Sequence, residues 1–240
     1  MIIVIPCYNE ALRLPLDQFV SFLNGHEKAE VLFVNDASTD DTLMVLKRIE
    51  NQFKNSVAII SNDKNVGKAE SVRRGVLHAA RDNNTTSIAY LDADLATSLE
   101  ECYSYQKYLD KGKKFVFASR ILKIGSIVER KFSRFLAGRI IATFISSILD
   151  VKVYDTQCGC KVFTPEIAQI AFKDAFISKW LFDVEIFSRI IKKFGKDTAL
   201  ESMDEIPVNK WVDQGESKVK PTYFFKLWID LYKIWKLHRA

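Results

Sequence analysis

Histidine and cysteine are scarce in this chain, which has three histidines and four cysteines among 240 residues. Nothing in the sequence places a histidine beside a serine or cysteine nucleophile, which argues against a hydrolase with a catalytic triad. The Cys-Gly-Cys at residues 158–160 lacks a second Cys or His pair at zinc-binding spacing, which argues against a structural zinc site. Because no signal peptide is recognisable, we expect reduced thiols in a cytosolic protein.

Long apolar runs are lacking as well. The best uncharged run, residues 140–149, would be about 15 Å long as a helix, which is half the hydrocarbon thickness of a bilayer. We therefore expect no segment that crosses a membrane. The hydrophobic content of 48% over 240 residues is still sufficient for one large buried core.

Positive charge is unevenly distributed, although the formal net charge is only +5. Residues 111–139 hold nine Lys or Arg against Glu129, and residues 218–240 hold six against Asp230. Such basic patches suit an acidic partner, whether nucleic acid, anionic lipid headgroups or a phosphate-bearing substrate. No recognised nucleic-acid-binding motif accompanies them, so we expect no nucleic-acid partner.

What the sequence does contain is an alternation of apolar, strand-like runs with segments of helical period. The runs are residues 2–5, 31–34, 57–60, 88–91 and 115–118. Residues 66–80 carry apolar side chains every three or four positions, as an amphipathic helix does. Strand and helix in turn predict an α/β fold with a mainly parallel sheet covered by helices on both faces. Ligands of such sheets bind at the carboxyl ends of the strands.

Polar side chains follow each of the first four predicted strands, namely Asn9, Glu10, Asp36, Asp63, Lys68, Asp92 and Asp94. Ser38 or Thr39 with Asp40 is typical of a helix N-cap, but that explanation does not cover the aspartates at 36, 92 and 94. Converging carboxylates repel each other unless a cation or hydrogen-bond donors lie among them. An Asp-x-Asp at a strand end suits Mg²⁺ or Mn²⁺ that also binds the phosphates of a nucleotide.

Six segments, taken in order over residues 1–219, resemble the family 2 inverting glycosyltransferases of GT-A fold: VIPCYNE, VNDASTDDT, NVGKAESVRRG, LDADLAT, DTQCGCKVF and WLFDVEIF. The similarity is greatest to dolichyl-phosphate glucosyltransferases, dolichyl-phosphate mannose synthases and bacterial polyprenyl-phosphate glycosyltransferases. It implies a Rossmann-like GT-A domain at 1–219, with a nucleotide-sugar half at 1–120 and an acceptor half at 121–219. A C-terminal amphipathic helix would follow at 220–240.

The resemblance implies roles on the donor side. The residues that would hold the base and ribose of a nucleotide diphosphate sugar are Pro6, Tyr8, Glu10 and Asp36, with Lys68 near the same pocket. Asp92 and Asp94 would form the metal-binding Asp-x-Asp, in which Asp94 binds the Mg²⁺ or Mn²⁺ on the diphosphate and Asp92 mainly holds the nucleoside side. The cation would neutralise the leaving diphosphate.

On the acceptor side, DTQCGCKVF matches the pattern Asp-Thr/Ser-Gln-x-Gly-x-Lys-x-Phe of the subgroup, from Asp155 to Phe163. A polyprenyl phosphate is ionised near neutral pH, so its site needs cations rather than a general base. The candidates are Arg120, Arg130, Arg134, Arg139 and Lys161, with Ser217 and Lys218 as further phosphate contacts. A sugar hydroxyl would need a carboxylate base, for which Asp155 and Asp183 stay open. Alternatively, Asp183 only caps a helix.

Two amphipathic stretches, residues 132–149 and 223–237, suit helices that lie in a lipid headgroup layer. In the second, Lys226, Asp230 and Lys233 fall within roughly 60° of helical arc. The alternative is a C-terminal helix packed on its own domain or on a second subunit, which leaves a homo-oligomer open. We expect a peripheral protein at the cytoplasmic face of a membrane.

The sequence therefore favours metal-dependent, inverting transfer of a hexose, glucose or mannose, from a nucleotide diphosphate sugar to a polyprenyl (dolichyl or undecaprenyl) phosphate. One alternative is a glycosyltransferase that uses a sugar hydroxyl in polysaccharide or glycolipid synthesis. Another is a non-catalytic nucleotide-binding module that recruits partners to membranes. The intact Asp36, Asp92 and Asp94 argue against this last alternative.

Overall fold

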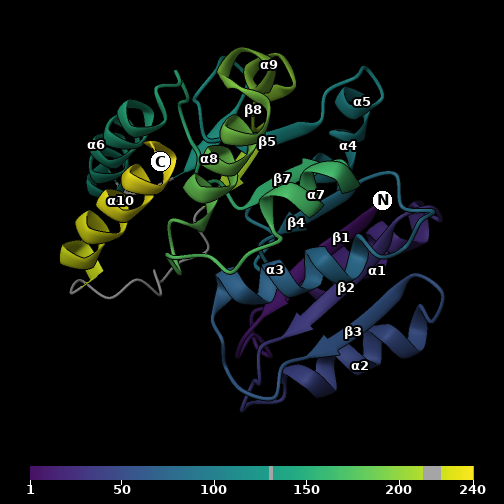
Figure 1. The fold of residues 1–240 in the computed structure, drawn as a ribbon. Coiled ribbons are helices and arrows are strands. Elements are labelled where there is room, and N and C mark those ends of the chain that lie inside the picture. Colours follow the sequence, from purple (N-terminus) through teal and green to yellow (C-terminus); the bar gives the residue numbers. More distant parts are fainter. Residues whose placement is uncertain (130–131, 213–222, 240) are drawn as a thin grey trace.

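The computed structural model describes residues 1–129, 132–212 and 223–239. The side chains of residues 133–134, 223–225 and 238–239 lie outside this description. Within it, the chain forms a central sheet with helices packed on both faces, as Figure 1 shows, and the predicted α/β fold is confirmed.

The sheet has seven strands in the order β3-β2-β1-β4-β7-β5-β8. They are β1 (Ile2–Cys7), β2 (Glu30–Asn35), β3 (Val57–Ser61), β4 (Ile88–Leu91), β5 (Phe115–Ser119), β7 (Cys160–Phe163) and β8 (Met203–Pro207). All neighbouring strands are parallel except β7, which runs antiparallel to both β4 and β5. The five predicted strands all form. β7 was not among them, because Lys161 interrupts its apolar run.

Successive residues of each strand face opposite sides of the sheet. In β1, Ile2 and Val4 belong to one buried apolar cluster, while Ile3 and Ile5 belong to another. The first cluster lies under α3 (Lys68–Ala79), α7 (Pro165–Ala171) and α8 (Phe182–Phe194). The second lies under α1 (Leu16–Gly25), α2 (Thr42–Gln52) and α4 (Leu99–Ser104). The short helices α5 (Gln106–Leu109) and α9 (Lys196–Glu201) complete this domain.

Two loops at the carboxyl ends of β1 and β2 are held together by side-chain hydrogen bonds. The Asn9 side chain accepts from the Thr39 N–H at 2.9 Å, and the Ser38 hydroxyl accepts from the Asn9 N–H at 3.1 Å. Neither Ser38 nor Thr39 caps α2, so the expectation that one of them is its N-cap is wrong. The N-cap position of α2 is Asp41, and Asp40 accepts from the Thr42 N–H at 3.0 Å. Ser38 and Thr39 instead fix the start of the candidate donor site.

The C-terminal helix packs on its own domain. α10 (Tyr223–Arg239) lies beside α6 (Phe132–Leu149) and contacts α8 (Figure 1), and a small parallel pair, β6 (Ile127–Glu129) with β9 (Lys210–Val212), precedes it. Asp230 is buried and accepts a 2.8 Å hydrogen bond from the Ser178 hydroxyl. It therefore does not share an exposed polar arc with Lys226 and Lys233, because this part of the helix packs against protein. None of the described helices is both long enough and apolar enough to span a bilayer.

Gly75 of α3 sits where the helix touches the sheet. A Cβ at this position would collide with the side chain of Val4 and would come within 2.7 Å of Val34. We expect Gly75→Ala to lower the free energy of unfolding by about 1–3 kcal/mol, because α3 must move off the sheet. Urea denaturation measures the change.

Gly138→Ala in α6 is the matched control, since a Cβ there meets nothing within 4 Å. This substitution should raise stability by about 0.5–1 kcal/mol through helix propensity. Equal effects of the two substitutions would contradict close packing of α3 on the sheet.

Candidate active site

The candidate site begins where β1, β2 and β4 end, at one edge of the sheet. These strands are parallel neighbours, so the sequence segments that follow them are brought together. Tyr8 is 39% exposed there, whereas Glu10 is buried and paired with Arg13 at 2.9 Å. Pro6 lies one residue before the end of the same strand. Tyr8 is thus an exposed aromatic residue of this loop that can offer a face to a ligand.

Asp36 fastens the loop between β3 and α3. Its carboxylate accepts hydrogen bonds from the Asn62 amide at 2.9 Å, the Val66 N–H at 2.9 Å and the Gly67 N–H at 2.8 Å. Only 2% of Asp36 is exposed. The structure therefore gives this carboxylate a role in shaping the edge at which β1, β2 and β4 end, which is called the donor edge below. Direct contact of Asp36 with a nucleoside stays a prediction.

The two aspartates of the Asp-x-Asp follow β4 on a tight turn, in which Leu95 has a φ of 49°. Asp92 lies 2.5 Å from the Lys68 ammonium, in an ion pair without good hydrogen-bond geometry for its buried Oδ1. Burial is the largest single effect on the pKa of Lys68 and lowers it, but Asp92 together with the charges of Asp183 and Asp94 outweighs burial, so the pKa is raised. Lys68 is therefore a protonated cation beside Asp92, and its place near a nucleotide-sugar pocket stays a prediction.

Asp94 is the carboxylate most in need of a cation. Burial, followed by the negative charge of Asp92, raises the pKa of Asp94, and the Ala96 N–H donates to it at 3.1 Å. A bound divalent cation would relieve both effects. The described residues contain no cluster of three ligating side chains. Two carboxylates suit Mg²⁺ or Mn²⁺, which take their remaining ligands from water and substrate phosphates.

The acceptor motif packs directly on the Asp-x-Asp. The Asp92 N–H donates to the Gly159 carbonyl at 3.0 Å, and a Cβ at position 159 would collide with the Asp92 carboxylate. Only glycine allows this approach. Because β7 is antiparallel to β4, the segment that leads into β7 lies at the same edge where β4 ends.

Asp155, the first residue of the motif, is held by Arg120. The Arg120 guanidinium donates to both carboxylate oxygens, at 2.6 and 2.9 Å. Burial by itself would raise the pKa of Asp155, but Arg120 outweighs it and lowers this pKa to about 2. Glu205 of β8 accepts the Asp155 N–H at 2.8 Å and fixes the same turn. Such an acidic, fully paired carboxylate is a poor general base near neutral pH.

Lys161 lies in the interior with no exposed surface. Its ammonium lies 2.8 Å from Asp183 and donates at 2.8 Å to the Cys158 carbonyl, and the Tyr90 hydroxyl donates to the same Asp183 carboxylate. A phosphate could reach Lys161 only by displacing Asp183, so contact of Lys161 with the acceptor phosphate stays a prediction. Lys161, Asp183 and Tyr90 thus form a buried polar cluster that connects β7, α8 and β4 close to the Asp-x-Asp.

Asp183 does not cap α8, so that alternative is wrong. The N-cap position is Leu181, and Asp183 lies in the first turn with its carboxylate turned to Lys161. Glu185, two positions on, binds the backbone N–H groups of Ile177 and Ser178 instead. Asp183 is only 5% exposed and already has two partners, which leaves it badly placed to act as a base.

A cavity of about 240 Å³ opens between α6 and the residues that precede β7. Its walls are mostly apolar, from Ile141 and Ile145 of α6, Leu227 of α10 and Trp180, with Arg120 and Arg139 as the cations. Arg139 donates to the Tyr154 carbonyl at 2.7 Å and stacks on the Tyr154 ring. Four further predicted acceptor contacts lie outside the described residues or side chains: Arg130, Arg134, Ser217 and Lys218.

Two residues of the site carried no signal that the sequence could reveal. Asn62 binds Asp36 and Glu205 binds Asp155, yet neither stands in a recognised motif. Trp180 does stand in the segment WLFDVEIF, but the sequence does not show that it lines the cavity. Their roles depend on contacts between distant parts of the chain.

Comparison with known proteins agrees with this geometry. The model of Glycosyl transferase family 2 matches residues 2–169. The dolichyl-phosphate beta-glucosyltransferase of Dictyostelium discoideum is 31% identical over 234 residues, which are 91% of this chain and 68% of that protein. The human dolichyl-phosphate beta-glucosyltransferase is 32% identical over 247 residues, which are 96% and 72% of the two chains.

Solved structures share the GT-A fold. Glucosyl-3-phosphoglycerate synthase from Mycobacterium tuberculosis, in complex with Mn²⁺, UDP-glucose and phosphoglyceric acid, has a TM-score of 0.69 at 12% identity over 98% of this chain and 79% of its own. Mannosyl-3-phosphoglycerate synthase from Rubrobacter xylanophilus has a TM-score of 0.67 at 15% identity, over 97% and 71%. At these identities the likeness concerns the fold alone.

The Lys161–Asp183 pair yields a stability prediction. Asp183→Ala should lower the free energy of unfolding by about 3–5 kcal/mol, because it leaves a buried ammonium without its counter-charge. Urea denaturation at neutral pH measures the loss.

The double variant Lys161→Met/Asp183→Ala is the control, since it removes both charges. It should recover a substantial part of the loss. If the double variant is less stable than Asp183→Ala by the full cost of Lys161→Met, the two residues are not coupled.

Proposed function

The chain belongs to glycosyl transferase family 2, and we propose that it transfers glucose from a nucleotide diphosphate sugar to dolichyl phosphate or another polyprenyl phosphate. The observation that carries this proposal is an acceptor motif whose carboxylate is neutralised by Arg120 beside an apolar cavity. An ionised, lipid-linked acceptor requires both features. Relatives named dolichyl-phosphate beta-glucosyltransferase support glucose as the sugar and dolichyl phosphate as the acceptor.

The donor would bind along the edge formed by β1, β2 and β4. Tyr8 would stack on the nucleoside, and Asp36 would shape the loop around it through Asn62 and Gly67. Asp94 and Asp92 would hold Mg²⁺ or Mn²⁺, which when bound supplies positive charge to the diphosphate. Solved relatives of the same fold with Mn²⁺ and UDP support this choice of cation.

The acceptor would enter the cavity beside α6 with its phosphate towards Arg120 and Arg139. One acceptor oxygen attacks C1 of the sugar as the bond from C1 to the diphosphate oxygen breaks, and the electron pair leaves with the diphosphate. Attack from the opposite side inverts C1, which fits the beta product in the relatives' names. No proton moves, because the phosphate is already ionised.

A sugar-hydroxyl acceptor is less well served. It requires a carboxylate that takes up a proton, yet Asp155 has a pKa of about 2 and pairs with Arg120. Asp183 is likewise engaged by Lys161 and Tyr90.

Lys161 would contribute by holding the Cys158 carbonyl and so the turn before Gly159. Arg134 of α6 remains our candidate for a further phosphate contact.

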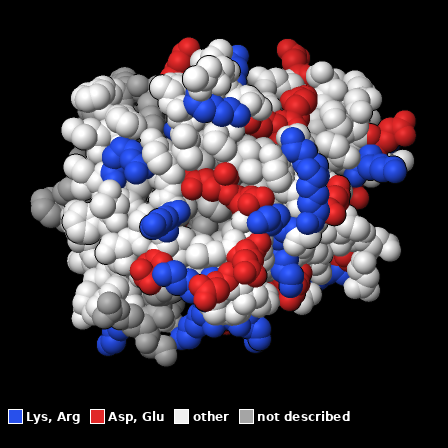
Figure 2. Space-filling view, turned by 90° about the horizontal axis from the view of Figure 1, so that it is seen from above, with Lys and Arg blue, Asp and Glu red and all other residues white. Residues whose placement is uncertain are grey.

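An apolar surface supports membrane attachment. Phe132, Leu136, Ile140 and Phe144 recur every fourth residue along α6 and are 46–75% exposed. On α10, which packs against α6, Ile229 and Tyr232 are 55% and 62% exposed. In Figure 2, charged side chains are sparser on the side of α6 and α10 than on the opposite side. We propose that this α6–α10 surface lies on the cytoplasmic face of a membrane that carries the acceptor.

Transfer of labelled sugar into extractable lipid tests the proposed reaction. Wild-type protein is incubated with a panel of nucleotide sugars that includes UDP-glucose and GDP-mannose, with dolichyl phosphate in detergent and MnCl₂ or MgCl₂. We expect wild-type protein to form glucosyl lipid from UDP-glucose and to form no lipid product in EDTA. Asp94→Ala should reduce the rate of lipid formation at least about 100-fold. Asp17→Ala, which removes an exposed carboxylate of α1, is the matched control.

Donor hydrolysis without any lipid product would contradict the polyprenyl-phosphate acceptor while keeping the glycosyltransferase. Equal lipid product with and without EDTA would contradict the divalent cation. Nucleotide binding without turnover on any donor would contradict catalysis altogether.

Flotation with vesicles of phosphatidylcholine and phosphatidylserine tests the α6–α10 surface. Leu136→Glu/Ile140→Glu should reduce vesicle binding at least about tenfold, since it places two charges at the buried depth of the interface. Leu200→Glu, at an exposed leucine of α9 away from that surface, should bind as the wild type does. Unchanged flotation of the double variant would contradict the assignment.

A further inference from the structure

The segment between α7 and α8, residues 172–181, is irregular but held by charged side chains on both sides. From α3, Arg73 donates to the carbonyls of Phe172 at 3.4 Å and Lys173 at 3.1 Å. From α8, Arg189 donates to the carbonyls of Ala171 and Asp174, both at 2.7 Å, and of Ala175 at 2.8 Å. Charge-assisted bonds to backbone carbonyls make this a fixed segment rather than a loose loop.

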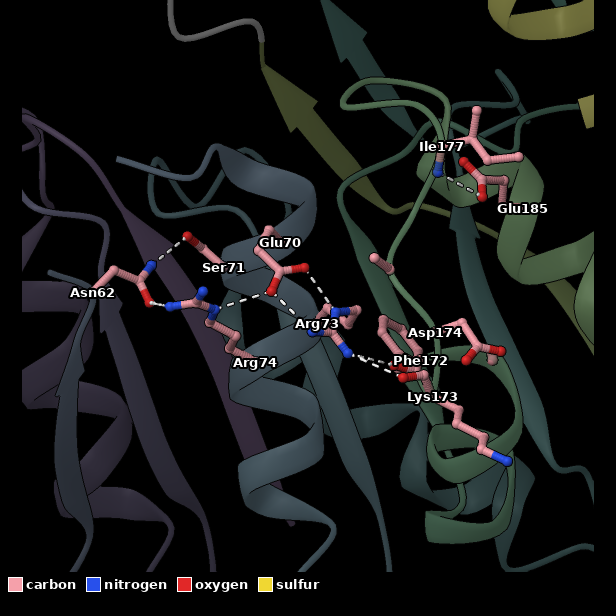
Figure 3. A network of polar contacts seen from close by, with 12 residues as sticks. Asn62, Glu70, Ser71, Arg73, Arg74, Phe172, Lys173, Asp174, Ile177 and Glu185 are labelled. Carbon is pink, nitrogen blue, oxygen red and sulfur yellow. Dashed lines mark hydrogen bonds and ion pairs between the residues drawn. The ribbon is translucent and has the colours of Figure 1, made fainter. Parts of the chain in front are cut away.

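Arg73 is itself part of a chain of contacts that leads to the donor edge, drawn in Figure 3. Glu70 accepts from Arg73 at 2.7 Å and from Arg74 at 3.0 Å, and Arg74 donates to the Asn62 side chain at 2.9 Å. Asn62 in turn binds Asp36. The segment and the donor edge are thus anchored to the same helix, α3.

Lys179 extends from this segment towards the donor edge. A Cβ on Gly67 would lie 3.7 Å from Lys179 Cδ, so the lysine stem passes the residue immediately before Lys68. The next residue, Trp180, lines the cavity beside α6. Lys179 therefore lies beside the residue that precedes Lys68 and is the chain neighbour of a residue that lines the proposed acceptor cavity.

The other cations of the site already have protein partners. Lys68 pairs with Asp92, Lys161 with Asp183 and Arg120 with Asp155. Lys179 is exposed and, among the described residues, forms no ion pair with a carboxylate. A flexible ammonium in that position is suited to a phosphate that arrives with a substrate.

We propose that Lys179 is a phosphate-binding residue of the reaction, and that its ammonium donates to a non-bridging oxygen of the nucleoside diphosphate of the donor and of the product. This inference rests on the proposed function. It assigns the diphosphate rather than the acceptor phosphate because the lysine stem passes Gly67, next to the Lys68–Asp92 pair. The added charge would stabilise the diphosphate as the sugar leaves.

Titration calorimetry of UDP, and of GDP in parallel, into the full chain with MnCl₂ tests the inference without requiring turnover. Lys179→Met should raise the Kd of the nucleotide that the wild type binds by about tenfold or more, the effect of one lost charge-assisted hydrogen bond. Lys179→Arg should keep most of the affinity. Lys173→Met is the matched control, because that exposed lysine belongs to the same segment and Figure 3 shows its side chain directed away from α3.

Transfer kinetics separate the two phosphates. An unchanged nucleotide Kd with a raised KM for dolichyl phosphate would overturn the diphosphate assignment and place Lys179 at the acceptor. Nucleotide affinity, KM and kcat all within twofold of wild type would overturn the inference while leaving the transferase intact. Wild-type nucleotide binding without lipid product would instead refute the proposed acceptor and leave the calorimetric test of Lys179 valid. No binding of either nucleotide by the wild type would refute both.

Discussion

The buried contact of Lys161 with Asp183 is the interaction on which the architecture of the site depends. It joins the antiparallel strand β7 to helix α8, and through the Tyr90 hydroxyl it also holds β4 just before the two carboxylates of the Asp-x-Asp. Lys161 also holds the Cys158 carbonyl, one residue before the glycine that touches Asp92. A charged pair of this kind costs desolvation energy, so its value lies in fixing one geometry rather than in stability alone.

Three cations of the site are already paired before any substrate arrives. Lys68, Arg120 and Lys161 each face an aspartate, and Asp94 is the acidic group that burial and a like charge leave strained. The proposed nucleoside diphosphate would bring further negative charge to a site in which these three cations are already engaged. On that proposal, a divalent cation at the Asp-x-Asp and Lys179, which forms no ion pair among the described residues, would supply the missing positive charge.

Much of the fold was predictable from local pattern. Apolar runs indicated the five strands, and the order of polar strand ends indicated the edge at which Asp36 and Asp92 follow β2 and β4. β7 was not predicted, because Lys161 interrupts its apolar run. Burial of Lys161 requires the Asp183 carboxylate of α8, which is distant in sequence. The sequence does not show side-chain partners, so Asp155 stayed open as a base until the structure showed Arg120 donating to both of its oxygens. For the same reason Asp230 was assigned to a polar arc with Lys226 and Lys233, whereas it is buried against Ser178.

The direction of β7 determines how the proposed donor and acceptor regions are joined. A continuous backbone ladder runs from β4 through β7 to β5, so the separation of the Asp-x-Asp from Arg120 and Asp155 is set by strand spacing. On the proposed function, adaptation to a longer or bulkier acceptor would occur in α6 and α10, at the periphery, while this separation stays constant.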